Sequence, residues 1–389
     1  MNTILHWLLL AVAVGIGWAL GRWRLREASK STAIGDEETL RERLQFLFTN
    51  YSDEAIESFL ETLAVSSETV NLHFSIGAHF REKGEVERAT LIHQNLLARP
   101  ELPARCSSQV AYELALDYLA AGLFDRAEAL LHELLGVQHY GALAAEQLTR
   151  LYQRERDWVK AAEMARRLVA VRDSPDVRKQ LAHLLCEQAL ENEAAESPAQ
   201  TKPLLERALE YDRECVRASL LLADWHQRHG QHREAQQRLV RVFEQNASFG
   251  PEAVVRLVRC AREAGNERKL RRRLYGLYQK YPSTTLLLNL VEQEERFKST
   301  QRARELLEFE MTRRPSLRGL LRLIEMNDPE PRGEDSQSHL ISRVGDMLLA
   351  GKPAYKCTRC GFGGQQLHWM CPSCKNWETV EPLYGVDGE

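Results

Sequence analysis

A long apolar run lies near the start of the chain, where 19 residues from Thr3 to Gly21 contain no charged side chain. At ~1.5 Å per residue, a helix of this length matches the hydrocarbon thickness of a bilayer. No Lys or Arg precedes the run, whereas Arg22, Arg24 and Arg26 follow it at once. A cleaved signal peptide has basic residues before a shorter apolar run, so this order favours a permanent anchor. The flanking charge places the residues after the span in the cytoplasm.

Small residues recur every four positions within this span, at Ala13, Gly17 and Gly21. Such rows let two membrane helices approach closely, although Gly and Ala are also frequent in single spanning helices. The sequence therefore leaves open whether the protein forms a homo-oligomer. We expect an anchor over residues 1–21 and a basic juxtamembrane linker over residues 22–35.

The body of the chain follows a helical repeat of the tetratricopeptide type, which has a period of about 34 residues. The small residue that begins the second helix of each unit recurs at steps of 34, 38, 34, 40, 34, 35 and 33 residues. This slot is filled by Ala55, Ala89, Ala127, Ala161, Thr201, Ala235, Leu270 and Ala303. Each helix pair exposes an apolar face that only a stacked neighbour can bury. We expect about eight helix pairs within residues 36–325.

Turn and cap signals agree with this reading. A glycine stands five residues before the slot in four units, at Gly84, Gly122, Gly230 and Gly265. These glycines mark the reversal between two antiparallel helices. The pair Ser174-Pro175 predicts a capped helix start. The segment from Glu191 to Pro203, with its two prolines, predicts an elongated turn.

Composition and charge narrow the function classes. The 389 residues are 44% hydrophobic and 28% charged, with few Gly and Pro for their length. A net charge of −3 gives no basic excess, so we expect no nucleic-acid partner. Walker loops, nucleophile elbows and zinc-protease helices are missing from the sequence, which indicates a non-enzyme. Helical arrays of this kind bind peptides or protein domains on a curved surface, with a plain spacer as the alternative.

Four of the eight cysteines form the strongest chemical signal. Cys357 and Cys360 make one CxxC turn, Cys371 and Cys374 make a second, and ten residues separate the turns. Two such turns bring four thiolates to the spacing of one tetrahedral metal site, which either zinc or iron can occupy. A pair of redox dithiols is the alternative, but those motifs belong to βαβ contexts. Four protein ligands leave no open position for a substrate, so a structural metal is expected.

The module around these cysteines spans residues 353–389 and is too small to fold without a bound metal or another crosslink. Four aromatic side chains supply nearly all of its apolar mass: Tyr355, Phe362, Trp369 and Trp377. A linker and docking helix over residues 326–352 precede it. We expect that helix to dock through an apolar stripe made of Leu340, Ile341, Val344, Met347 and Leu348. The remaining cysteines lie in apolar helical contexts typical of core thiols: Cys106, Cys186, Cys215 and Cys260.

The order of these parts resembles the lipopolysaccharide assembly protein B family of Gram-negative bacteria over the full chain. The strings that carry the resemblance are RWRLRE after the span, GEVERATLIHQNLLARP at residues 84–100, and YKCTRCGF, WMCPSC and GVDG near the end. The tail of that family is rubredoxin-like. The resemblance therefore favours iron over zinc at Cys357, Cys360, Cys371 and Cys374.

The same resemblance implies a regulator in the bacterial inner membrane that crosses once and has its bulk on the cytoplasmic side. It implies an adaptor that promotes degradation of the lipid A pathway deacetylase by the membrane-bound AAA+ protease FtsH. The implied partners are that protease, the deacetylase and other lipopolysaccharide assembly proteins. Two alternatives stay open: a hub that assembles lipopolysaccharide synthesis and transport proteins, and a rubredoxin-like electron-transfer protein. We expect an all-α tetratricopeptide-repeat solenoid with an N-terminal transmembrane helix and a small C-terminal rubredoxin-like or zinc-ribbon metal domain.

Overall fold

The structure is a computed structural model that describes residues 53–62, 67–100, 102, 104–195, 198–327, 337–386 and 388–389. The predicted anchor, the juxtamembrane linker and the beginning of the array lie outside these residues. Among the helices that are described, none combines the length and the apolar character needed to cross a bilayer.

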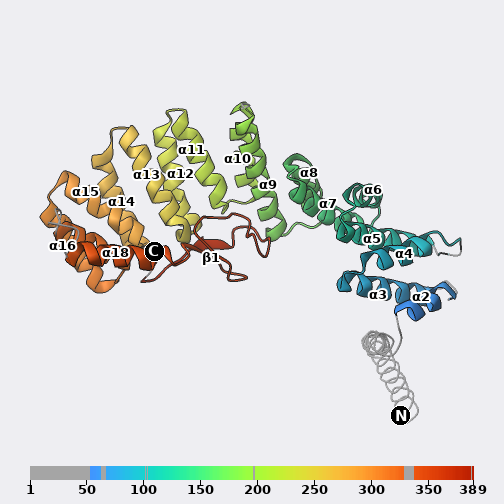
Figure 1. Ribbon diagram of the computed structural model, residues 1–389. Coiled ribbons are helices and arrows are strands. Elements are labelled where there is room, and N and C mark those ends of the chain that lie inside the picture. The colour runs from blue at the N-terminus through green and yellow to red at the C-terminus, as the bar shows by residue number, and fades with distance from the viewer. Residues whose placement is uncertain are drawn as a thin grey trace, which may run out of the picture. The chain divides into compact units, whose positions relative to one another are not determined.

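Antiparallel helix pairs follow one another through the described chain, as a tetratricopeptide-like solenoid requires (Figure 1). The first helices of the pairs are α3 (Ser67–Lys83), α5 (Ala104–Ala121), α7 (Gly141–Glu155), α9 (Pro175–Ala194), α11 (Val216–Arg228), α13 (Gly250–Glu263), α15 (Thr284–Phe297) and α17 (Leu317–Asn327). The second helices that follow α3 to α15 in turn are α4 (Val86–Leu97), α6 (Phe124–Leu134), α8 (Trp158–Val171), α10 (Pro198–Tyr211), α12 (His232–Gln245), α14 (Glu267–Lys280) and α16 (Thr300–Arg313). The helix α2 (Asp53–Thr62) precedes α3 and stands in the position of a second helix. A short 3-10 turn, η1 (Ala247–Phe249), precedes α13.

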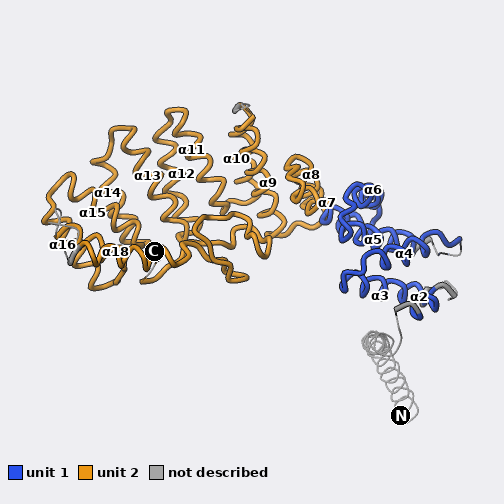
Figure 2. Tube along the Cα trace, in the orientation of Figure 1, with its two compact units in different colours: residues 1–147 blue, residues 148–389 orange. Residues whose placement is uncertain are grey.

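The chain divides into two compact units, residues 1–147 and residues 148–389, with the boundary inside α7 (Figure 2). In the first unit, α2, α3 and α4 share a core that contains Ile76 and Phe80. In the second unit, a continuous core runs from α11 to α17 and includes Phe243, Phe249 and Leu290. Each unit therefore buries the apolar faces of its own stacked helices.

The slot residues explain how closely the helices of a pair can approach. Seven of the eight are at most 3% exposed: Ala89, Ala127, Ala161, Thr201, Ala235, Leu270 and Ala303. Small or compact side chains there let the facing helix pack near the backbone. Ala55, in α2, is exposed, so the close approach expected at that slot is not found among the described residues.

The turns between paired helices share one backbone geometry. Gly84, Gly122, Gly230 and Gly265 all have positive φ, between 64° and 86°, as the sequence predicts. Arg156 occupies the same place five residues before Ala161 and has a φ of 62°. A side chain with a Cβ is disfavoured in this left-handed region, so the turn at Arg156 is strained where its four counterparts are not.

The connection between α9 and α10 differs from the prediction. Ser174 caps α9 as expected, because its hydroxyl accepts a hydrogen bond from the Val177 N–H at 3.4 Å. The helix then continues to Ala194, and α10 begins at Pro198 with Pro203 inside it. The prediction of an elongated turn from Glu191 to Pro203 is therefore wrong. The extra residues lengthen α9 to 20 residues, against 13 in α11. Pro198 is tolerated because a helix start has no use for its missing N–H.

The predicted helix before the cysteine module forms as α18 (Gln337–Ala350), but it docks by another face than expected. Gly345 is buried against α17, where an added Cβ would lie 2.4 Å from Leu321 Cδ2. The predicted stripe stays 46–71% exposed: Leu340, Ile341, Val344, Met347 and Leu348. The docking prediction is therefore wrong about the face, because close approach at a glycine decides the contact rather than apolar bulk.

A three-stranded antiparallel sheet carries the cysteine module. Its strands are β1 (Tyr355–Cys357), β2 (Gly363–Gly364) and β3 (Val380–Pro382), in the order β2-β1-β3. Tyr355 pairs with Gly364 on one side and with Pro382 on the other. Residues 355–382 are called the ribbon below, and residues 383–389 are called the tail.

Candidate metal centre

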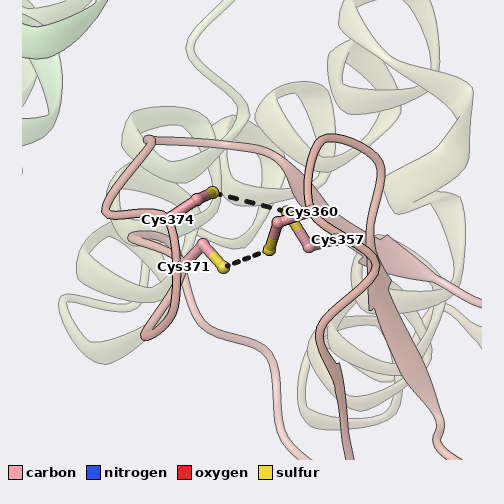
Figure 3. Close-up of side chains that lie close together, drawn as sticks. All are labelled: Cys357, Cys360, Cys371 and Cys374. Carbon is pink, nitrogen blue, oxygen red and sulfur yellow. Dashed lines mark hydrogen bonds between the residues drawn. The ribbon is translucent and has the colours of Figure 1, made fainter. Parts of the chain in front are cut away.

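The four predicted ligands come together at one end of the ribbon (Figure 3). The Sγ atoms of Cys360 and Cys371 are 3.6 Å apart, those of Cys357 and Cys374 are 3.8 Å apart, and all four lie within 4.8 Å of one another. A tetrahedral ion with metal–sulfur bonds of ~2.3 Å needs sulfur–sulfur distances of ~3.8 Å. The thiol geometry therefore fits one metal ion held entirely by the protein.

Two matching turns hold the thiols in place. The Gly361 N–H donates to the Cys357 carbonyl at 3.0 Å, and the Lys375 N–H donates to the Cys371 carbonyl at 2.9 Å. The residue after each second cysteine adopts the left-handed conformation, with φ of 79° at Gly361 and 56° at Lys375. Glycine is the residue that this conformation favours, whereas a lysine such as Lys375 gives no such signal in a sequence.

The environment favours ionised sulfur at two of the four positions. Burial opposes ionisation of Cys357, but hydrogen bonds with Thr379 and with the N–H groups of Cys360 and Arg359 outweigh it and lower the pKa of that thiol to about 6. A hydrogen bond with Asn376 lowers the pKa of Cys374. Burial raises the pKa of Cys371 to about 11. Because a metal binds thiolates and displaces their protons, a bound cation would ionise the thiol that burial keeps protonated, Cys371.

The two tryptophans of the ribbon pack against the array and not in the core of the ribbon itself. Phe362 and Tyr355 pack around the buried Cys357, Cys371 and Val380. Trp377 instead stacks on His183 of α9, with ring centroids 5.0 Å apart, and its Nε1–H donates to Gln153 Oε1 at 3.3 Å. Trp369 stacks on Phe249 at 5.3 Å. The ribbon is therefore stabilised by the array as well as by its cysteines.

Glu378 makes a polar anchor beside Trp377. Its carboxylate accepts a hydrogen bond from the Val216 N–H at 3.3 Å and lies 3.4 Å from Lys179 Nζ and 3.8 Å from His183 Nε2. Burial would raise the pKa of Glu378, but His183, Lys179 and Val216 together lower it. Burial lowers the pKa of His183. At neutral pH the anchor is therefore an ionised carboxylate beside a neutral imidazole.

The tail continues the contact along the first helices of the array. The Glu389 carboxylate accepts from the Thr285 N–H at 2.9 Å and from the Thr285 hydroxyl at 2.6 Å, and it pairs with Arg318 at 2.9 Å. The Leu317 N–H donates to the Val386 carbonyl at 2.8 Å. At the edge of the ribbon, the Tyr355 hydroxyl donates to Glu252 at 2.5 Å. We call Lys179, His183, Val216, Glu252, Thr285 and Arg318 the docking surface.

The sequence did not reveal this docking surface. Its hydrogen bonds join residues 71–162 positions apart, which no local period reports. One feature of the sequence pointed to such a surface. A short ribbon with two tryptophans has more aromatic surface than it can bury alone, so part of it must pack against another element. The four scattered cysteines are buried as expected: Cys106, Cys186 and Cys260 lie in helices, and Cys215 is the N-cap residue of α11.

Both the ribbon and part of the array match known protein families. A family model described as a rubredoxin metal binding domain matches residues 355–382, and one described as a tetratricopeptide repeat matches residues 193–254. The lipopolysaccharide assembly protein B of Escherichia coli K12 is 30% identical over 387 residues, which are 99% of this chain and 99% of that protein. The chain belongs to the lipopolysaccharide assembly protein B family. Its relative of the same description from Haemophilus influenzae is 31% identical and covers 97% of this chain and 98% of its own.

Solved structures add only a general likeness to the family picture. A crystal structure of MamA has a TM-score of 0.34 at 16% identity and covers 47% of this chain and 95% of that one. A tetratricopeptide repeat protein from Parabacteroides merdae also has a TM-score of 0.34, at 12% identity, over 72% of this chain and 100% of that one. Neither likeness is close enough to carry structural detail.

Proposed function

We propose that this chain is a membrane-anchored adaptor that regulates lipopolysaccharide assembly by binding other proteins. The observation that carries the proposal is the end-to-end match to the lipopolysaccharide assembly protein B of Escherichia coli, at 99% of both chains. A match of that extent includes the apolar run from Thr3 to Gly21, which the proposal assigns as a single spanning helix with the array on the cytoplasmic side.

The array supplies surface for partners beyond the part that the ribbon covers. A groove of about 530 Å³ lies along the first helices α9, α11 and α13, away from the docking surface. Its lining includes Leu190, Leu221, Asp224 and Arg259, and Arg259 pairs with Asp224 at 3.2 Å. Such a groove, with an apolar surface and charged side chains along it, suits a protein segment, which supports a binding role.

The metal centre has a structural part in this proposal. With four cysteine ligands, a bound iron or zinc ion would tie the two CxxC turns together and leave no open position for a substrate. The rubredoxin-like resemblance favours iron. The ion would contribute folding free energy to the ribbon, since a segment of this size has too little apolar core of its own.

The partners in the proposal come from the family resemblance. We infer that the adaptor brings the lipid A pathway deacetylase to an FtsH-type membrane protease, and that tethering at the membrane raises the local concentration of the client. The raised local concentration depends on the single membrane-spanning anchor. Without the anchor each binding surface survives, but the effective concentration falls.

The half-life of the deacetylase in growing cells tests the proposal. Full-length protein should restore a short half-life to a strain that lacks the gene, whereas a variant without residues 1–21 should leave the half-life long although it folds and loads metal. A half-life that is the same with and without the full-length protein would overturn the adaptor and leave the assembly hub. A soluble variant that restores turnover fully would overturn the tethering step alone.

A further inference from the structure

The ribbon and the tail accept hydrogen bonds from the starts of three helices of the array. Glu378 accepts from the first N–H of α11 at Val216, Glu389 accepts from Thr285 in the first turn of α15, and the Val386 carbonyl accepts from Leu317 at the start of α17. Helix N-termini carry unpaired N–H groups and a positive dipole end, so they favour carboxylates. The array thus presents two helix starts that bind carboxylates and a third that binds a backbone carbonyl, and this chain fills all three itself.

A cationic side chain lies beside each of the two carboxylates, and the two indole rings lie near an arginine of α11. Lys179 lies beside Glu378, and Arg318 lies beside Glu389. The Arg217 guanidinium lies 6.0 Å from the ring centroids of both Trp369 and Trp377. The surface therefore recognises an extended segment that carries an indole, a carboxylate next to it, and a second carboxylate eleven residues further on.

The groups that dock are built directly on the second cysteine turn. The Cys371 N–H donates to the Asn376 carbonyl at 2.9 Å, and the Glu378 N–H donates to the Trp369 carbonyl at 2.6 Å. Met370 and Trp377 form an isolated β-bridge between these bonds. Trp369, Trp377 and Glu378 consequently keep their relative positions only while the loop through Cys371 and Cys374 keeps its shape.

We propose that the docking surface is a binding site for acidic, aromatic protein segments, which residues 377–386 and 388–389 occupy within the chain as long as a metal ion holds the cysteine turns. Loss of the ion loosens the second turn, the ribbon leaves α9 to α17, and the vacated helix starts accept a segment of the same chemistry from another protein. This inference rests on the metal site in the proposed function. It adds a second binding surface whose availability depends on metal occupancy.

Amide exchange at the helix starts tests the coupling in full-length protein. Exchange is measured by mass spectrometry on peptides that contain Val216 and Thr285, before and after zinc is removed with a chelator. The inference predicts that exchange in both peptides speeds up by at least about tenfold when the ion is lost. A peptide from α4, in the other compact unit, serves as the internal control and should not change.

A matched variant separates docking from metal binding. Glu378→Gln keeps all four cysteines, so it should bind one equivalent of zinc while its Val216 peptide exchanges about tenfold faster. Metal content is measured on the same samples. Failure of the wild-type protein to bind metal would defeat the proposed metal site, whereas full metal binding with unchanged exchange on zinc removal would overturn only the coupling.

A labelled peptide tests the binding surface itself. The probe is a fluorescent peptide with the sequence of residues 375–389, which contains no cysteine. Metal-loaded protein with both Glu378→Gln and Glu389→Gln should bind it at least about tenfold more tightly than the metal-loaded wild type, whose own segment competes at high effective concentration. A double variant that binds the peptide no better than the wild type would overturn the proposal.

Discussion

Replacing Trp377 by alanine should release the ribbon from the array. The side chain is 8% exposed, stacks on His183 at an interplanar angle of 11°, and donates its indole N–H to Gln153. Truncation of a buried tryptophan costs about 3–5 kcal/mol. If that cost falls on docking, the population of undocked ribbon rises by roughly 150- to 4,000-fold.

Metal release provides the assay, because the undocked ribbon has too little core to hold its turns together. The protein is loaded with zinc, and transfer to a coloured chelator is followed by absorbance. Trp377→Ala should lose zinc at least about a hundredfold faster than the wild type. Trp377→Phe keeps an aromatic ring and loses only the indole hydrogen bond, about 1 kcal/mol, so its release should speed up about fivefold.

Trp225 offers the matched control. It stacks on His229 at 3.9 Å in the same unit, so it makes the same type of ring contact without the ribbon as partner. Trp225→Ala should release zinc at the wild-type rate. The reasoning is refuted if Trp377→Ala folds, binds one zinc and releases it as slowly as the wild type.

Three further outcomes follow from the structure. Arg156→Gly relieves a left-handed backbone at φ 62° and should raise the thermal midpoint by about 2–4 °C, whereas Gly230→Ala, with open space around the added Cβ, should lower it. Cys357→Ser with Cys360→Ser should abolish metal binding and protease resistance of residues 353–389, and a retained equivalent of metal would contradict the assignment. Burial lowers the pKa of His183 below 6.5, so stability should fall as the pH drops from 7 to 5.5.

The pH prediction has a specific control. The folded state disfavours protonation of His183, which faces Glu378, Arg217 and Asp212, so stability is lost once the pH passes below the ordinary histidine pKa of 6.5. The pKa of Glu378 is lowered, so its contribution is lost only below its ordinary value of 4.5. His183→Phe should therefore flatten the pH dependence of unfolding between pH 7 and 5.5. A variant with the same slope as the wild type would contradict the assignment.

Local signals in the sequence predicted those features that depend on local geometry. The slot alanines and the turn glycines reflect close approach and positive φ, which act on single residues at a fixed period. The positive φ of Arg156 could not be predicted, because an arginine in the left-handed conformation has no distinguishing mark in the sequence. The paired CxxC turns gave the candidate ligands directly, since each turn is a four-residue unit with its own hydrogen bonds.

Features that depend on distant partners could not be read in the same way. Trp377 is 224 residues from Gln153, and Glu389 is 104 residues from Thr285, so neither contact leaves a pattern in the intervening sequence. The stripe on α18 has the helical period of a docking face, yet the buried contact is made at Gly345. Periodicity reports which faces are apolar, whereas the packing of neighbouring elements decides which face is covered.

The most direct test of the metal centre is X-ray absorption at the metal edge of full-length protein purified without added metal. A site built from Cys357, Cys360, Cys371 and Cys374 predicts one shell of four sulfur atoms at ~2.3 Å around a single iron or zinc ion. A first shell that contains nitrogen or oxygen, or fewer than four sulfur atoms, would contradict the four-cysteine site.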